Sequence, residues 1–254
     1  MPVIVEETNN YSVVFKPAKM HTSRGEGENL LDWYTARTDS VYDVMHRLDY
    51  ETHGLVLFAK NEISFNFFKD LQDRGEFVKE YSAVVYSDIH HTEAQRHGEE
   101  EEKIYISNNE NLQSGFPPCP PSLRDSVRNN SDLSIESYFR PFGPGRKLVR
   151  PVVDIPKKHK EIAKDKGGFY KTKIIEKKDN IFTVQINRGF RHQIRCHLCW
   201  IGFPILNDPL YTNEIYANLT EIDTAKQLAL RSHALYFTDP VSMEKKECRI
   251  EALG

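Results

Sequence analysis

Short apolar runs of strand length divide the chain into elements. Tyr11–Phe15 is β-branched and aromatic and precedes a proline, which is typical of a strand that a proline ends. Gly54–Ala59 is apolar throughout, which favours a strand buried on both faces. Glu76–Tyr86, rich in Val, Tyr and Phe, also predicts a strand. Further strands are predicted over residues 169–176, 181–187, 228–237 and 246–250.

Three segments predict helices. In the longest, residues 62–74, apolar side chains recur at helical spacing and Gly75 follows where a C-terminal cap belongs. The other two are the short helix Leu30–Ala36 and the helix His192–Ile201, which Gly202 ends.

Two connecting segments complete the pattern. Lys177–Asn180 predicts a hairpin turn with Asn180 in a left-handed conformation. Residues 87–145 show no steady period and contain clusters of Glu, Pro, Asn and Ser, so they predict a long insertion or loop. Because the strands fall in antiparallel-looking pairs with helices between some of them, the fold class is predicted to be α+β.

Composition limits the class of protein. The chain has 254 residues, of which 39% are hydrophobic, enough for one large domain or two lobes that share a core. No apolar run approaches the roughly 18 residues that a membrane span needs. Residues 1–7 lack the pattern of a secretory signal. Four cysteines do not suggest a disulfide scaffold. We therefore expect a cytoplasmic protein with no membrane partner.

The charges are unevenly distributed, although the net charge is only −3. Residues 87–136 hold 10 acidic and 4 basic side chains, a balance of −6, whereas residues 146–178 hold 12 basic and 4 acidic ones, a balance of +8. A basic stretch in an otherwise acidic chain is a candidate surface for RNA phosphates. A solvated face or a loop would explain the same count.

The segment His46–Gly54 brings an imidazole, a guanidinium and a carboxylate together just before a buried strand. Loops held by rigid strands are where catalytic groups concentrate, and a carboxylate such as Asp49 can act there as nucleophile or general base. A turn in which Asp49 caps backbone amides explains the same residues equally well.

A second group of polar residues, 189–198, overlaps the last predicted helix. His192 and Arg195 are three residues apart and would share a helix face. An arginine on a rigid helix can fix a carboxylate with two parallel hydrogen bonds. An ordinary surface helix whose cations bind water or phosphate is the alternative.

Cys196 and Cys199, with two histidines nearby, suggest a zinc site. Structural zinc needs four ligands, usually from two separated pairs, and the sequence has no second CxxC. Cysteines in helices are more often small buried side chains. The sequence also lacks GxxxxGK[ST], GxGxxG and HExxH, so we expect no nucleotide cofactor and no metal.

Three segments together resemble a known family. Residues 46–60 read HRLDYETHGLVLFAK, residues 79–85 read KEYSAVV, and residues 192–211 read HQIRCHLCWIGFPILNDPLY. They resemble, in order, the motifs HRLD-x-x-T-S-G-L-x-L-x-A-K, K-x-Y-x-A-x-V and HQIR-x-H-L-x-x-I-G-x-P-I-x-G-D-x-x-Y of RluA-type RNA pseudouridine synthases. Similar matches at Val13–Ala18 and Leu230–Pro240 extend the resemblance over most of the chain.

The resemblance implies a mixed, largely antiparallel sheet flanked by helices, with a central RNA-binding cleft. It implies a single catalytic domain over residues 1–254, with the insertion at about 87–145. The reaction would convert specific uridines of structured RNA, rRNA or tRNA, to pseudouridine without a cofactor. We expect a monomer with RNA as its partner. We expect no N-terminal S4-like RNA-binding domain, and the basic residues 146–178 would partly replace one.

The resemblance also implies roles for single residues. Asp49 would be the nucleophile that detaches and reattaches the uracil. Tyr81 would stack against the base and remove, or help to remove, its C5 proton. Arg195 would pair with Asp49 and keep it ionised. Arg47 would fill the gap left when the target nucleotide flips out of the RNA stack. Further substrate contacts are expected from His46, Thr52, His192, Gln193 and Leu206.

The chain departs from the family pattern in three places, which suggests a divergent subfamily with altered substrate contacts. His53 replaces a serine, Phe190-Arg191 replaces an arginine followed by Ser or Thr, and Asn207 replaces a glycine. Two other interpretations remain open. One is a non-catalytic RNA-binding or RNA-chaperone protein on the same fold, and the other is a zinc-dependent nucleic-acid protein.

Overall fold

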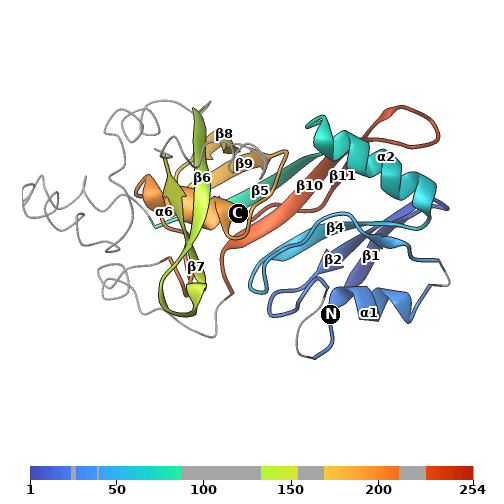
Figure 1. Cartoon of the computed structure of the whole chain (residues 1–254), viewed down its shortest axis with the longest axis horizontal. Helices are drawn as coiled ribbons and strands as arrows, with labels where there is room; N and C mark the ends of the chain where they lie inside the picture. The colour runs from blue at the N-terminus through green and yellow to red at the C-terminus, as the bar shows by residue number, and fades with distance from the viewer. Residues whose placement is uncertain (24–26, 39, 87–132, 154–168, 212–226, 254) are drawn as a thin grey trace, which may run out of the picture. The chain divides into compact units, whose positions relative to one another are not determined.

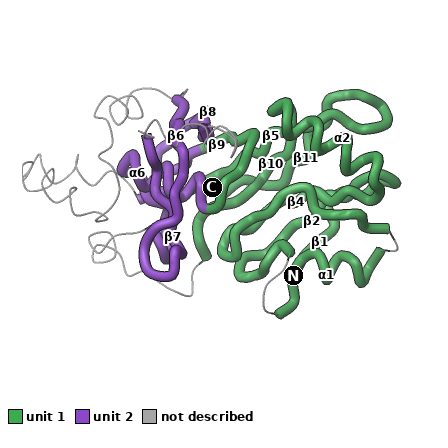
Figure 2. The backbone as a smooth tube through the Cα atoms, viewed as in Figure 1, with its two compact units in different colours: residues 1–83, 183–191, 227–254 green, residues 84–182, 192–226 purple. Residues whose placement is uncertain are grey.

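The computed structural model describes residues 1–23, 27–38, 40–86, 133–153, 169–211 and 227–253. The chain divides into two compact units (Figure 2). Unit 1 comprises residues 1–83, 183–191 and 227–254, and unit 2 comprises residues 84–182 and 192–226. Within the described ranges, no helix has the length and apolar character that a membrane crossing requires.

Unit 1 is built on a mixed sheet with the strand order β1-β2-β4-β10-β5 (Figure 1). Strand β11 pairs with β10, and the two-residue β3 pairs with β4. Only the β4–β10 pair is parallel among these strands. The predicted α+β class with a largely antiparallel sheet is therefore confirmed. The strands are β1 (Val3–Glu7), β2 (Tyr11–Lys16), β3 (Asp43–Val44), β4 (His53–Ala59), β5 (Val78–Val84), β10 (Leu230–Thr238) and β11 (Lys245–Arg249).

Strand β4 is buried at every residue because packing covers both of its faces. On one face, Leu57 joins a core cluster with Phe68 of helix α2 (Glu62–Asp73). On the other face, the ring of Phe58 lies 4.8 Å from that of Tyr34 in helix α1 (Leu30–Thr35). Both helices and this doubly buried strand are as the sequence predicts. The cluster contains Tyr11, Val13, Met45, Leu55, Leu57, Ala59, Phe68, Leu71, Phe77, Leu235, Phe237 and Cys248.

Unit 2 contains three antiparallel strands in the order β8-β6-β7 and the helix α6 (Gln193–Trp200). The strands are β6 (Leu133–Phe142), β7 (Leu148–Val152) and β8 (Tyr170–Lys178), and the short helical turn η3 (Pro144–Arg146) joins β6 to β7. The boundary between the units falls inside the next strand, β9 (Ile181–Ile186).

Two predictions for unit 2 are wrong. Residues 133–142 form β6, not part of a loop, and the rest of the predicted insertion, residues 87–132, lies outside the described residues. Burial alternates in β6 only around residues 135–137, and Ser137 is one of its two buried residues, so the apolar signal in the sequence is weak. In the hairpin between β8 and β9, Asp179 takes the left-handed conformation (φ 53°) instead of Asn180, because β8 continues through Lys178.

Glycine is required where β4 approaches β10. Gly54 has φ +123° and is paired in register with Ser232. A Cβ atom at Gly54 would lie 2.2 Å from the backbone oxygen of Ser232 and 2.6 Å from its nitrogen. Since neither contact involves a side chain that could turn away, any side chain here forces the two strands apart.

A buried carboxylate fixes β5 beside its neighbours. Glu80 accepts hydrogen bonds from Gln185 (2.7 Å) and Arg249 (3.1 Å), and its Oε1 lies 3.0 Å from Nε2 of His233. Burial alone would raise the pKa of Glu80, but the hydrogen bonds from His233 and Gln185 and the positive charges of His233 and Arg249 lower it to about 2. The cluster anchors the residue next to Tyr81.

We expect Gly54→Ala to destabilise the protein by about 2–5 kcal/mol, because the substitution adds steric overlap to an unfavourable φ. Denaturant unfolding would measure this loss. Gly27→Ala is the matched control, since Gly27 also has positive φ (80°) but nothing within 4 Å of its would-be Cβ. Equal losses for the two variants would contradict the steric explanation.

We expect Glu80→Gln to reduce the acid sensitivity of the protein. The folded-state pKa of about 2 is below the usual value of 4.5, so this carboxylate stabilises the fold above pH 4.5 and that stabilisation is lost as the pH falls towards 2. Between these pH values, the wild type should lose on the order of 2 kcal/mol more unfolding free energy than the variant. If unfolding free energy falls with pH equally in the wild type and in Glu80→Gln, the explanation is wrong. Glu244→Gln, at an exposed carboxylate, is the control.

Candidate functional site

Asp49 lies in the loop between β3 and β4 of unit 1, partly exposed, with its backbone fixed on both sides. The hydroxyl of Thr22 donates to the carbonyl of Leu48 and accepts from the amide of Leu48, both at 3.0 Å. The amide of Thr52 donates to the carbonyl of Asp49 at 3.1 Å. A backbone turn therefore forms from Asp49 to Thr52 and holds the carboxylate-bearing residue in one place, while capping of backbone amides by the Asp49 side chain stays a prediction.

A buried lysine lies beside this loop. The ammonium of Lys16 donates to the carbonyls of Pro17 (2.9 Å), Met20 (2.8 Å) and Tyr50 (3.4 Å). Burial lowers the pKa of Lys16 to about 8, while the negative charge of Asp49 acts in the opposite direction. The protonated lysine thus fixes the loop and places a positive charge near the carboxylate. The sequence identified Lys16 only as the end of a strand.

Tyr81 belongs to the same unit as Asp49 and is 5% exposed. It lies on β5 in register with Ser232 of β10, which is in turn in register with Gly54 at the end of the Asp49 loop. Burial raises the pKa of Tyr81, and the charge of Asp49 raises it further, so the phenol is neutral at ordinary pH. This electrostatic interaction brings two of the three predicted catalytic residues together.

The third predicted catalytic residue, Arg195, lies on α6 in unit 2 and is 2% exposed. Its Nε and Nη2 atoms donate to the two carboxylate oxygens of Asp208, at 2.8 and 2.7 Å. Asp208 also accepts from the backbone amides of Leu210 (2.9 Å) and Tyr211 (3.1 Å). The predicted pair of Arg195 with Asp49 would join residues of different units and stays a prediction.

Asp208 was not among the predicted site residues, although the family motif, which ends in G-D-x-x-Y, contains an aspartate at its position. In a buried site a bidentate pair fixes the plane of the guanidinium, so Asp208 decides how Arg195 is presented.

The predicted substrate contacts of unit 2 surround α6. His192 has φ +57° just before the helix, and its Nδ1 lies 3.2 Å from the hydroxyl of Tyr211. The amide of Gln193, 2% exposed, donates to the carbonyl of Lys171 (3.0 Å) and to the hydroxyl of Thr172 (3.2 Å). These bonds tie the start of the helix to β8.

Leu206 follows α6 and is partly exposed, and its amide donates to the carbonyl of Val84 at 2.8 Å. Contact of Leu206, His192 or Gln193 with substrate stays a prediction.

The predicted contacts of unit 1 divide by exposure. Arg47 is exposed, so its side chain is accessible to a ligand. Nε2 of His46 accepts from the amide of Leu57 (3.3 Å), and burial, followed by the charge of Lys79, lowers the pKa of His46 well below its usual value. Thr52 is 2% exposed. His46 is therefore neutral and anchors the loop to β4, and contact of these residues with RNA stays a prediction.

The two cysteines of α6 are protonated and internally bonded. Cys196 donates to the carbonyl of Val149 at 3.4 Å and Cys199 to that of Tyr211 at 3.1 Å. Burial raises the pKa of both thiols, that of Cys199 to about 12. Because metal ligation requires thiolate, these contacts do not favour the zinc interpretation. In the part of the chain that the structure describes, no three His, Cys, Asp or Glu side chains form a group that could hold a metal ion.

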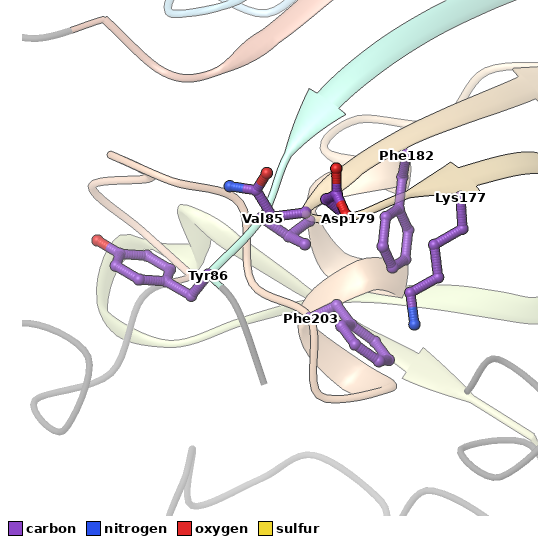
Figure 3. Close-up of a pocket in the computed structure, with 7 residues that line it drawn as sticks. Val85, Tyr86, Lys177, Asp179, Phe182 and Phe203 are labelled. Atoms are coloured by element: carbon purple, nitrogen blue, oxygen red, sulfur yellow. The ribbon is translucent and has the colours of Figure 1, made fainter. Parts of the chain in front are cut away.

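A pocket of about 350 Å³ lies in unit 2 (Figure 3). The ammonium of Lys177 lies 5.6 Å from the ring centre of Phe182 and 5.1 Å from that of Phe203. None of the predicted site residues lines the pocket. Its lining residues are Val85, Tyr86, Lys177, Asp179, Asn180, Phe182 and Phe203.

Comparison with solved structures supports the fold. The human RNA pseudouridylate synthase domain containing 1 matches with a TM-score of 0.64 at 16% identity, covering 99% of this chain and 83% of that one. The human RNA pseudouridylate synthase domain containing 4 matches with a TM-score of 0.57 at 15% identity, covering 98% and 88%. At such identities the matches show a shared fold.

Comparison of sequences identifies relatives of the same kind. An uncharacterized RNA pseudouridine synthase of Helicobacter pylori is 28% identical over 236 residues, which cover 92% of this chain and 70% of the relative. The ribosomal large subunit pseudouridine synthase C of Rickettsia felis is 26% identical over 256 residues, which cover 93% and 69%. The family model described as RNA pseudouridylate synthase matches residues 10–200. The chain therefore belongs to the RNA pseudouridylate synthase family, a family of isomerases, as its motifs predict.

Proposed function

We propose that this chain isomerises uridine in structured RNA to pseudouridine, with Asp49 as the nucleophile. The reaction breaks the bond between N1 of the base and C1′ of the ribose and forms a bond between C5 and C1′. A proton leaves C5 and N1 gains one, so the step is balanced without an oxidant or reductant. The observation that carries the proposal is the placement of Asp49 and Tyr81 in one unit, close enough for the carboxylate to raise the pKa of the phenol.

The surroundings suit a carboxylate nucleophile. The backbone bonds of Leu48 and Thr52 hold Asp49 in place, so little entropy is lost when the substrate binds. The ammonium of Lys16 donates to the carbonyl of Tyr50, the residue after Asp49, and so places a positive charge beside the nucleophile loop. The attack would form a covalent intermediate, either at C1′ of the ribose or on the base, and the detached uracil would then turn before C5 bonds to C1′.

Tyr81 contributes a buried aromatic ring and a neutral hydroxyl. Its raised pKa makes the phenolate costly, so the phenol acts in the ground state as a stacking surface and a hydrogen-bond donor. To remove the C5 proton as a base, the Tyr81 oxygen must first give up its own proton, or must pass that proton on while it accepts the one from C5. Assistance in proton transfer therefore fits these surroundings better than action as a free phenolate base.

The substrate is proposed to be ribosomal or transfer RNA. The relative from Rickettsia felis is named a ribosomal large subunit enzyme, which supports ribosomal RNA as the first RNA to test. The basic residues 146–178, of which 154–168 lie outside the described part of the chain, would contribute affinity for phosphates.

We expect Asp49→Asn to lower pseudouridine formation by about 10³-fold or more, because the amide cannot serve as the anionic nucleophile. Pseudouridine would be mapped across total RNA from cells that lack the gene and carry the wild-type or variant chain. Asp43→Asn, at an exposed carboxylate of β3, is the matched control and should restore the modification. Full modification with Asp49→Asn would contradict the assignment of Asp49 as nucleophile. Absence of gene-dependent pseudouridine from every RNA would contradict the proposal that the chain is an enzyme.

We expect Asp208→Asn to cost about 3–5 kcal/mol of stability, because the variant leaves the guanidinium of Arg195 buried without its anionic partner. Thermal or denaturant unfolding would measure this, and the rate of pseudouridine formation below the unfolding transition should fall as well. Glu136→Gln is the control, since it breaks a pair with Lys171 in the same unit whose side chains are both about half exposed (49% and 56%). Its cost should stay below about 1 kcal/mol. Equal effects of the two variants would contradict the importance of the buried pair.

A further inference from the structure

An exposed aromatic pair lies next to the proposed nucleophile. Tyr50 directly follows Asp49 and is 44% exposed. Its ring centre lies 4.7 Å from that of His21, with an angle of 42° between the planes. The imidazole thus covers part of the tyrosine ring, while much of the ring stays open to solvent. A large aromatic side chain beside the proposed nucleophile thus keeps an accessible face that a ligand can contact.

The pair is held by the same bonds that hold the Asp49 loop. The carbonyl of His21 accepts from the amide of Leu30 at 2.9 Å, which ties it to the start of α1. The next residue, Thr22, makes the two bonds that fix Leu48. The carbonyl of Tyr50 accepts from the buried ammonium of Lys16 at 3.4 Å. The backbones that carry the two rings therefore keep a fixed position relative to the nucleophile, which lowers the order that a ligand must impose on binding.

We propose that the His21–Tyr50 pair is a stacking platform for a nucleobase adjacent to the target uridine, an inference that rests on the proposed function. Single-stranded and looped RNA is bound largely by stacking of unpaired bases on aromatic side chains, and every base has a π face. When the target uridine leaves the stack, its neighbouring base loses a stacking partner. An aromatic surface one residue from the nucleophile replaces that partner.

The charge beside the platform agrees with this ligand. Arg47, three residues before Tyr50, is exposed, and the guanidinium that is predicted to fill the gap in the RNA stack also brings a positive charge that attracts the neighbouring phosphates. A stacked base with a contacted phosphate is the usual unit of single-strand binding. Because stacking is tolerant of base identity, the platform contributes affinity and register and selects only weakly among sequences.

The test uses the full chain and a single-stranded 12-nucleotide RNA in which 2-aminopurine flanks one uridine. Binding is followed by anisotropy, and stacking by quenching of the 2-aminopurine fluorescence. We expect Tyr50→Ala to raise the Kd about 5- to 100-fold and to abolish most of the quenching. Tyr50→Trp should keep the affinity and the quenching of the wild type. His21→Ala should give a smaller rise, because it removes the support of the ring and leaves the ring itself.

Tyr42→Ala is the matched control. Tyr42 is 49% exposed in the same unit, and its ring centre lies 5.1 Å from that of Phe65. It precedes β3, whereas Asp49 follows that strand. It should bind the RNA like the wild type. The thermal unfolding temperature of Tyr50→Ala should equal that of the wild type, since the side chain is exposed. With RNA from cells lacking the gene as substrate, Tyr50→Ala should raise KM and leave kcat unchanged.

The platform is overturned if Tyr50→Ala binds and quenches like the wild type, or if Tyr42→Ala weakens binding as much as Tyr50→Ala does. The proposed function fails in a different way, when the wild type forms no pseudouridine in any RNA. Selective weakening by Tyr50→Ala in that case would still support a base-stacking surface on this loop.

Discussion

The approach of two backbones at Gly54 is the constraint on which the proposed site depends. Gly54, Ser232 and Tyr81 follow one another across β4, β10 and β5, in register. Neighbouring strands are about 4.8 Å apart, so this row sets the end of the Asp49 loop roughly 10 Å from Tyr81. The parallel pairing of β4 with β10 covers only two residue pairs, and one of them is the glycine. The sheet thus fixes the loop and the tyrosine together, before any substrate binds.

Electrostatic surroundings then decide the protonation states near Asp49. The buried ammonium groups of Lys16 and Lys79 have pKa values lowered to about 8, chiefly by burial, and both remain largely protonated at neutral pH. The imidazoles of His46 and His53 are kept neutral, because burial lowers their pKa values. Near the loop, positive charge therefore comes from the buried lysines and from the exposed Arg47. The phenol of Tyr81 stays neutral because burial and the charge of Asp49 both raise its pKa.

The sequence predicted the elements with strong periods and missed the roles that depend on distant contacts. The doubly buried β4 and the amphipathic α2 were clear because a continuous apolar run and a helical repeat are local signals. Strand β7 was not predicted, because it is only five residues long and contains Arg150 and Pro151, two residue types that weaken the apolar signal of a strand. The motifs supplied Asp49 and Tyr81, but nothing local marked Lys16 as a buried cation. The partner of Arg195 within unit 2, Asp208, is 13 residues away and was visible only as one letter of a motif.

The three departures from the family pattern differ in kind, and the structure separates them. His53 is 4% exposed, and its ring centre lies 6.3 Å from that of Phe15. The histidine in place of the usual serine therefore changes the packing inside unit 1. Asn207 has φ +58°, a conformation that glycine adopts freely and that asparagine tolerates better than most residues, so the exchange preserves the backbone. The segment Phe190-Arg191 is partly to fully exposed. Because His53 is buried and Asn207, like Phe190, is partly exposed, Arg191 is the departure that changes the outer surface most, and it is the first residue to substitute in a test of altered RNA contacts.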